Sequence, residues 1–187
     1  MTSKVKNRIP DKKECLELMD KYHMPPHIRQ HSLVVCKIAL SIARALNEAG
    51  ESLNIAEIEA ASLLHDITKA ESFGTGADHA KTAAQLLKGL GYGRIAEIVR
   101  EHVGPQNSAK ATTEEEVVCY ADKRVLHDRV VSIEERFDCL KERYGKDEKA
   151  VHLINAMGEK IKGIERKILK KANCEASDII SRHSQVV

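Results

Sequence analysis

Residues 61–69 form the stretch Ala61-Ser62-Leu63-Leu64-His65-Asp66-Ile67-Thr68-Lys69. An apolar helical segment ends here in an adjacent histidine and aspartate, His65 and Asp66. An unpaired charge directly after two leucines would be costly to bury. We therefore interpret the pair as ligands of a metal ion. Imidazole nitrogen and carboxylate oxygen suit borderline or hard divalent cations such as iron, manganese, zinc, cobalt or nickel.

Further histidines and one aspartate lie beside other segments with helical periodicity, at His31, His79, His102 and Asp122. One ion needs only three or four protein ligands, so the six candidates together predict two divalent transition metals. Consecutive helical residues point about 100° apart. His65 and Asp66 can therefore serve one ion together while a carboxylate oxygen of Asp66 reaches the second.

Size and charge limit the possible classes of protein. The chain has 187 residues with 42% apolar content, which is enough to bury the core of one domain. Thirty lysines and arginines against 28 acids give a net charge of +2, so the charge balance indicates no nucleic-acid partner.

Cysteine usage and hydropathy predict a soluble protein of the reduced cytoplasm. The five cysteines are odd in number and scattered, without a closely spaced pair that would indicate a zinc ribbon. No uncharged stretch reaches the 18 residues of a membrane helix, and no apolar signal-peptide core follows the basic amino terminus. We expect no membrane association.

Apolar residues recur at spacings of three and four along almost the whole chain, which predicts an all-α fold. The expected helices run from about Lys12 to Tyr22, His27 to Ala49, Ile55 to Ile67, Asp78 to Leu90, Gly93 to Val103, Thr113 to Asp128, Ser132 to Tyr144 and Asp147 to Ala172. The loops from Glu71 to Ala77 and from Gly104 to Ala111 directly follow candidate ligands, so we expect them to hold or admit a substrate.

We divide the chain into an N-terminal helical segment (1–22), one helical domain (23–145) and a C-terminal helix with a tail (146–187). The last helix carries an apolar stripe at Ile154, Met157, Ile161, Ile164 and Ile168. Such a stripe packs on the rest of the domain or on a second subunit. A homodimer through this helix is therefore one expectation.

The order His31, His65-Asp66, Asp122 resembles the metal-binding pattern of the HD-domain metal-dependent phosphohydrolases, over roughly residues 23–145. The Leu-Leu-His-Asp-Ile-x-Lys form and the Tyr-Ala before Asp122 also match. The resemblance implies a single helical HD domain in which these four residues bind the first metal. His79 and His102 are similar to the extra ligands of dinuclear members, such as the bacterial HD-type symmetrical diadenosine tetraphosphate hydrolases, and would hold the second.

Lys69 departs from one part of this superfamily. HD nucleotidases that act on nucleoside monophosphates have a catalytic glutamate three residues after the aspartate. This chain has Lys69 at that position. A cation there suits phosphate binding better than general-base catalysis, although a surface lysine is the alternative. The extended motif of cyclic dinucleotide phosphodiesterases is also missing.

Four other basic residues near the ligands are candidates for substrate contact: His27, Arg29, Lys123 and Arg124. His27 precedes His31 by one helical turn and shares its face. The other three are alternatively salt-bridging residues of the scaffold.

The sequence thus predicts a phosphohydrolase in which a metal-activated hydroxide attacks a phosphoester or phosphoanhydride of a small nucleotide-like substrate. Asp66 would bridge the metals and Lys69 would neutralise the transferred phosphoryl group. Some HD-fold proteins with the same six ligands are mixed-valent di-iron oxygenases, and this is the competing prediction. A catalytically idle nucleotide-binding module is a third.

Overall fold

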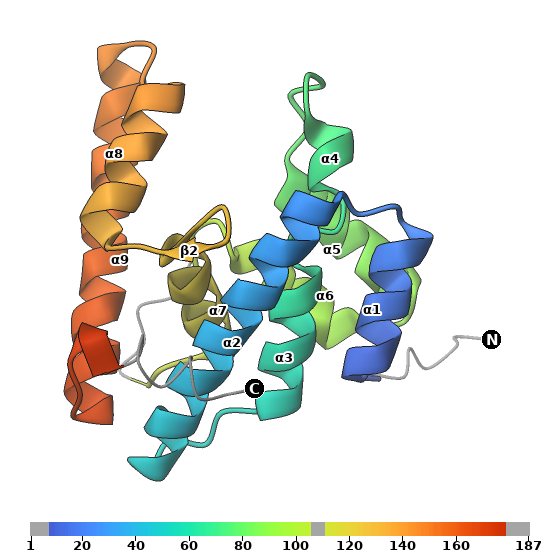
Figure 1. Cartoon of the computed structure of the whole chain (residues 1–187), viewed down its shortest axis with the longest axis horizontal. Helices are drawn as coiled ribbons and strands as arrows, with labels where there is room; N and C mark the ends of the chain where they lie inside the picture. The colour runs from blue at the N-terminus through green and yellow to red at the C-terminus, as the bar shows by residue number, and fades with distance from the viewer. Residues whose placement is uncertain (1–7, 106–110, 179–187) are drawn as a thin grey trace.

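The computed structural model describes residues 8–105 and 111–178, which form α-helices and one short pair of antiparallel strands (Figure 1). The helices are α1 (Lys12–Lys21), α2 (Pro26–Glu48), α3 (Ile55–Leu64), α4 (Lys69–Ser72), α5 (His79–Gly89), α6 (Gly93–Glu101), α7 (Glu114–Lys123), α8 (Ile133–Tyr144) and α9 (Glu148–Ala172). The strands are β1 (Val125–Leu126) and β2 (Arg129–Val130). The all-α prediction is confirmed.

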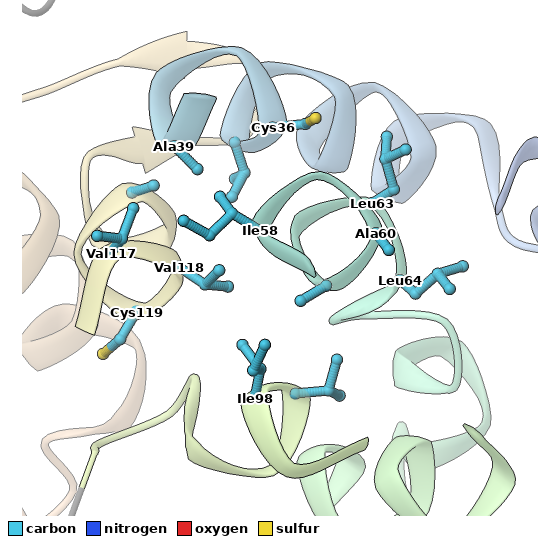
Figure 2. Close-up of a cluster of buried hydrophobic side chains, with 14 of the residues drawn as sticks. Cys36, Ala39, Ile58, Ala60, Leu63, Leu64, Ile98, Val117, Val118 and Cys119 are labelled. Carbon is cyan, nitrogen blue, oxygen red and sulfur yellow. The ribbon is translucent and has the colours of Figure 1, made fainter. Parts of the chain in front are cut away.

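Helices α2, α3, α6 and α7 supply the centre of the core, which also includes side chains of α1, α5, α8 and α9. Figure 2 shows Ile58 of α3 pointing between Ala39 of α2 and Val118 of α7, with Ile98 of α6 on the far side. All four side chains are fully buried. Burying a large aliphatic side chain stabilises a fold by about 1.5 to 3 kcal/mol, so this packing fixes the helices that carry the site. Among the described helices, none combines the length and the apolar character that crossing a bilayer requires.

The predicted helix from Ile55 to Ile67 ends earlier than expected. Helix α3 ends at Leu64, and the chain continues through a turn into α4. The backbone amides of Ile67 and Lys69 donate to carbonyls three residues earlier, at Leu64 and Asp66. These short-range bonds tighten the chain at the end of the helix, which turns His65 and Asp66 into the interior.

The prediction of a helix from Thr113 to Asp128 is wrong in its last third. Helix α7 ends at Lys123, and the chain that follows it forms a hairpin of β1 and β2. The side chain of Arg124 donates to the carbonyl of Val131 at 2.7 Å, and the Val131 amide donates back to the Arg124 carbonyl at 2.9 Å. This exchange folds the chain back, and His127 takes a positive φ of 58° in the turn.

The stripe on α9 packs within the chain, because Ile161, Ile164 and Ile168 are buried in the common core. A polar contact adds to it, since the Tyr120 hydroxyl donates to Glu165 of α9 at 2.7 Å. The homodimer stays a prediction. Residues 1–7 of the predicted N-terminal segment, 106–110 of the second predicted loop and 179–187 of the predicted tail lie outside the described residues.

Candidate metal centre

Five segments of the fold bring the six predicted metal ligands together. The ligands come from α2, the turn after α3, the start of α5, the end of α6 and the end of α7, as His31, His65, Asp66, His79, His102 and Asp122. Five of the six are buried, and His79 is half-buried. The fold thus gathers, in one place, residues that are up to 91 positions apart in the sequence.

A first group of donor atoms surrounds one oxygen each of Asp66 and Asp122. Nε2 of His31 lies 3.0 Å from Oδ1 of Asp122, and Nε2 of His65 lies 3.6 Å from the same oxygen. Nε2 of His65 is also 3.3 Å from Oδ2 of Asp66. Two imidazoles and two carboxylates therefore converge within the distance over which one ion is shared.

A second group lies on the other oxygen of Asp66. Oδ1 of Asp66 is 3.4 Å from Nε2 of His79 and 3.7 Å from Nε2 of His102. The two histidine nitrogens are 3.2 Å apart. The two carboxylate oxygens of Asp66 thus face different sets of ligands.

Backbone carbonyls hold three of the imidazole rings in position. Nδ1 of His65 lies 2.8 Å from the Ser62 carbonyl, and Nδ1 of His102 lies 2.6 Å from the Val99 carbonyl, each three residues earlier at the end of a helix. Nδ1 of His31 lies 2.8 Å from the carbonyl of His127 in the hairpin. Since a carbonyl only accepts, Nδ1 of each ring carries a proton, and Nε2 points into the cluster as the atom that would bind a metal.

Two buried polar atoms test whether these residues fit a metal. Nε2 of His65 and Oδ1 of Asp66 have no hydrogen-bond partner among the described residues. A buried polar atom without a partner costs about 1 to 3 kcal/mol. A divalent cation would satisfy both atoms, and the imidazole-carboxylate set is the one that borderline transition metals prefer. These imidazole and carboxylate groups therefore fit a divalent metal ion.

The electrostatics of the cluster favour cation binding. Burial opposes ionisation of Asp66, but the neighbouring cations of His65 and Lys69 outweigh it and hold the pKa of Asp66 well below its usual range. Burial, with the charge of His65, lowers the pKa of His102 to about 3, and burial also lowers the pKa of His79. Both imidazoles are therefore neutral near pH 7 and could each offer a nitrogen lone pair to a cation.

His65 is the exception, because it lies between two carboxylates. Burial alone would lower its pKa, but the negative charges of Asp66 and Asp122 raise the pKa to about 10. A cation that binds the first group of donors must displace this proton.

We expect Mn²⁺ binding near neutral pH to release a proton from His65. Because that proton is bound at any pH below about 10, metal affinity should rise with pH, by up to about tenfold per unit between pH 6 and 9. Calorimetry in buffers of different ionisation enthalpy counts the released protons. The exposed His152 of α9 provides the control, since His152→Asn should change nothing. An affinity independent of pH would contradict the expectation.

Two lysines contact the carboxylates from opposite sides. Nζ of Lys69 lies 2.6 Å from Oδ2 of Asp66, and this side chain is 30% exposed. Nζ of Lys123 lies 2.5 Å from Oδ2 of Asp122 and 3.4 Å from the His102 carbonyl, and it is buried. Burial works against the charge of Lys123, yet Asp122 raises its pKa. Lys123 therefore orients a ligand from within the protein, whereas Lys69 is accessible.

The structure does not bring Arg29 or Arg124 to the ligands. Arg29 pairs with Asp20 of α1. Arg124 is buried and donates to the Tyr120 hydroxyl at 2.7 Å and to Glu165 at 3.2 Å. Both geometries favour the scaffold alternative over substrate contact.

A cavity of about 210 Å³ opens beside the cluster between α2, α4, the hairpin and α8. It is lined by His27, Ile28, His31, Asp66, Lys69, Phe73, Leu126, His127, Arg136 and Arg143. The sequence predicted His27 and Lys69 as substrate contacts, and both are present. It did not indicate Phe73, His127, Arg136 or Arg143. The spacing of seven places the two arginines on one face of a helix, but nothing in the sequence shows that this face lines a cavity.

The sequence matches a known protein family over the part of the chain that carries the cluster. A family model described as the HD domain matches residues 28–125. That range contains all six candidate ligands and ends before α8.

Several relatives cover most of the chain. An uncharacterised protein of Methanocaldococcus jannaschii is 24% identical over 153 residues, which cover 74% of this chain and 89% of that protein. Proteins named tRNA (cytidine(56)-2'-O)-methyltransferase from Thermoplasma volcanium and Picrophilus torridus are 29% and 27% identical over 70% of this chain. The matched region spans only 41% and 40% of those two proteins.

A solved structure has a similar fold. The crystal structure of a predicted HD superfamily hydrolase from an uncultured Thermotogales bacterium superposes with a TM-score of 0.51 at 19% identity. The match covers 91% of this chain and 98% of that one. At this identity the likeness supports the helical fold, including the helices outside residues 28–125.

Proposed function

The chain belongs to the HD domain family, and from this premise we propose that it is a metal-dependent phosphohydrolase with a dinuclear centre and a nucleotide-like substrate. We expect its activity to be similar to that of the small dinuclear members of the family, such as the HD-type diadenosine tetraphosphate hydrolases. Methyl transfer is not part of it, because the chain spans about two fifths of the relatives that are named for that activity.

The observation that carries the proposal is the position of Asp66. One of its oxygens lies 3.3 Å from Nε2 of His65, and the other lies 3.4 Å from Nε2 of His79. A carboxylate in this position can serve two ions at once. Two such ions would act as Lewis acids toward a phosphoryl oxygen and would lower the pKa of a coordinated water.

The protein side chains supply the rest of the chemistry. Lys69 places an ammonium group at the wall of the cavity, next to Asp66, where it can neutralise a phosphoryl oxygen. Lys123 and the carbonyl contacts of the imidazole rings hold the ligands in fixed orientations. His65 and His102 are at most 1% exposed, whereas His31 and Asp66 line the cavity, so a substrate in the cavity could reach these two candidate ligands directly.

The competing function is a mixed-valent di-iron oxygenase, which would use the same six ligands. The cavity suits a phosphorylated substrate, because Lys69, Arg136 and Arg143 line it and only one acid, the candidate ligand Asp66, does so among the described residues. Such a surface selects anionic molecules.

Anaerobic turnover tests the function. The purified protein, loaded with Mn²⁺ or Fe²⁺ without oxygen, is assayed with mono-, di- and polyphosphate nucleotides in water enriched in ¹⁸O. Hydrolysis is expected to proceed without dioxygen and to place one ¹⁸O atom in a product phosphate. Activity that requires dioxygen and consumes it would instead establish the oxygenase.

We expect two transition metals per chain in the native protein, and one after removal of the second group of ligands. The double variant His79→Ala/His102→Ala should keep one ion, because it leaves the group of His31, His65 and Asp122 complete. Elemental analysis after anaerobic purification counts the metals. The His23→Ala/His152→Ala protein, in which both changes lie outside the site, is the matched control. One metal per chain at saturation, in the native protein as well as in the His79→Ala/His102→Ala variant, would contradict the dinuclear centre.

A further inference from the structure

The wall of the cavity opposite α4 is formed by α8, which lies beyond the residues that the HD family model matches. Arg136 and Arg143 line the cavity from this helix. They are seven residues apart and therefore share one face, about 10 Å apart along the helix axis. Two guanidinium groups from outside the matched range thus line the cavity beside the candidate metal ligands.

Neither arginine has an ion-pair partner among residues 8–105 and 111–178. Arg124 pairs with Glu165, and Arg94 pairs with a cluster of acids. By contrast, Nε of Arg136 is buried and has no hydrogen-bond partner among the same residues. Arg143 is exposed at the rim. A buried donor without a partner is costly, so an anion in the cavity would stabilise it.

The other charges around the cavity also favour an anion. Lys69 adds a third cation at the end next to the metal ligands. Asp66, the one acid in the lining among the described residues, already contacts Lys69 and the histidines. No carboxylate in the described lining is therefore left to neutralise the arginines.

We propose that Arg136 and Arg143 form a subsite for a second anionic group of the substrate, such as a second phosphate. This rests on the proposed function, in which the first phosphoryl group lies beside Asp66 and Lys69. The preferred substrates then carry at least two phosphate groups, as nucleoside diphosphates, polyphosphates or bisphosphates do. Simple monoesters engage only the Lys69 end.

Binding of two fluorescent nucleotides to the metal-loaded protein tests the subsite. The probes are a non-hydrolysable ATP analogue and an AMP analogue, at submicromolar concentrations too low to strip the metals. We expect the ATP analogue to bind about 10- to 100-fold more tightly, and Arg136→Ala/Arg143→Ala to bring the ratio close to one. Arg143→Ala alone, at an exposed position, should lower the ratio without affecting folding.

Lys141→Ala is the matched control. It removes the same charge from the same helix, but Lys141 pairs with Asp138 and does not line this cavity, so the ratio should stay at the wild-type value. A ratio near one in the wild-type protein, or one unchanged in the double variant, would overturn the subsite. A preference that depends on the arginines, without hydrolysis of any nucleotide, would keep the subsite and remove the hydrolase. Hydrolysis of a nucleotide without such a preference would keep the hydrolase and exclude the subsite.

Discussion

The Asp66→Ala variant is expected to lose catalysis and metal binding together while it remains folded. The carboxylate faces both sets of candidate ligands, with its two oxygens 3.3 Å from His65 and 3.4 Å from His79. Its removal should lower both metal affinities and reduce kcat by at least about 10³-fold. The core of α2, α3, α6 and α7 does not depend on it. Elemental analysis, phosphate release and far-ultraviolet circular dichroism measure the three properties.

Two further variants sharpen this test. Asp66→Asn keeps the volume but loses the charge, and it should behave like Asp66→Ala. Asp78→Asn removes a carboxylate next to His79, where Asp78 caps α5 by accepting from the amides of Ala80 and Lys81. Asparagine caps a helix equally well, so that protein should keep its metals and activity. Two tightly bound metals in Asp66→Ala would exclude the bridging role.

The candidate ligands could be predicted because each lies beside a local pattern that is legible in the sequence. His65 and Asp66 follow an apolar helix, and Asp122 lies in an apolar segment, so the sequence alone indicates that their charges need a partner. The structure places all six within one cluster. Helix positions followed from apolar periodicity in the same way.

The end of α7 could not be predicted, because tertiary contacts decide it. Val125, Leu126 and Val130 continue an apolar pattern that suits a helix or a strand equally. The hairpin forms because Arg124 bonds to Val131 and to Glu165 of α9, which is 41 residues away. The same contacts hold Arg124 outside the lining of the cavity.

The cavity wall could not be predicted for a related reason. Arg136 and Arg143 are ordinary surface residues in an amphipathic helix when the sequence is considered alone. Their position in the cavity wall depends on the hairpin, which precedes α8 and lines the same cavity beside the candidate metal ligands. His127 similarly has the sequence context of a structural residue, but its carbonyl fixes the ring of the ligand His31.

Lys69 and Lys123 make the same kind of contact but differ in what surrounds them. Each ammonium lies within 2.6 Å of an oxygen of a ligand carboxylate. Lys123 is buried and also bonds to the His102 carbonyl, so it holds Asp122 and the end of α6 in position. Lys69 lines the cavity and has solvent on one side. Under the proposed function, we therefore expect a substrate phosphate to contact Lys69 and not Lys123.

Lys69→Ala is accordingly expected to lower kcat by about 10²- to 10³-fold, equivalent to about 2.7 to 4 kcal/mol of transition-state stabilisation, without loss of metal. Lys69→Arg should recover part of the rate, because it keeps the charge with a different geometry. Lys81→Ala, an exposed position on α5, is the control and should be neutral. Steady-state kinetics with parallel metal analysis separate the effects. Normal turnover by Lys69→Ala would reduce the lysine to a solvated residue at the start of α4, and loss of metal would show that it supports Asp66 instead of the substrate.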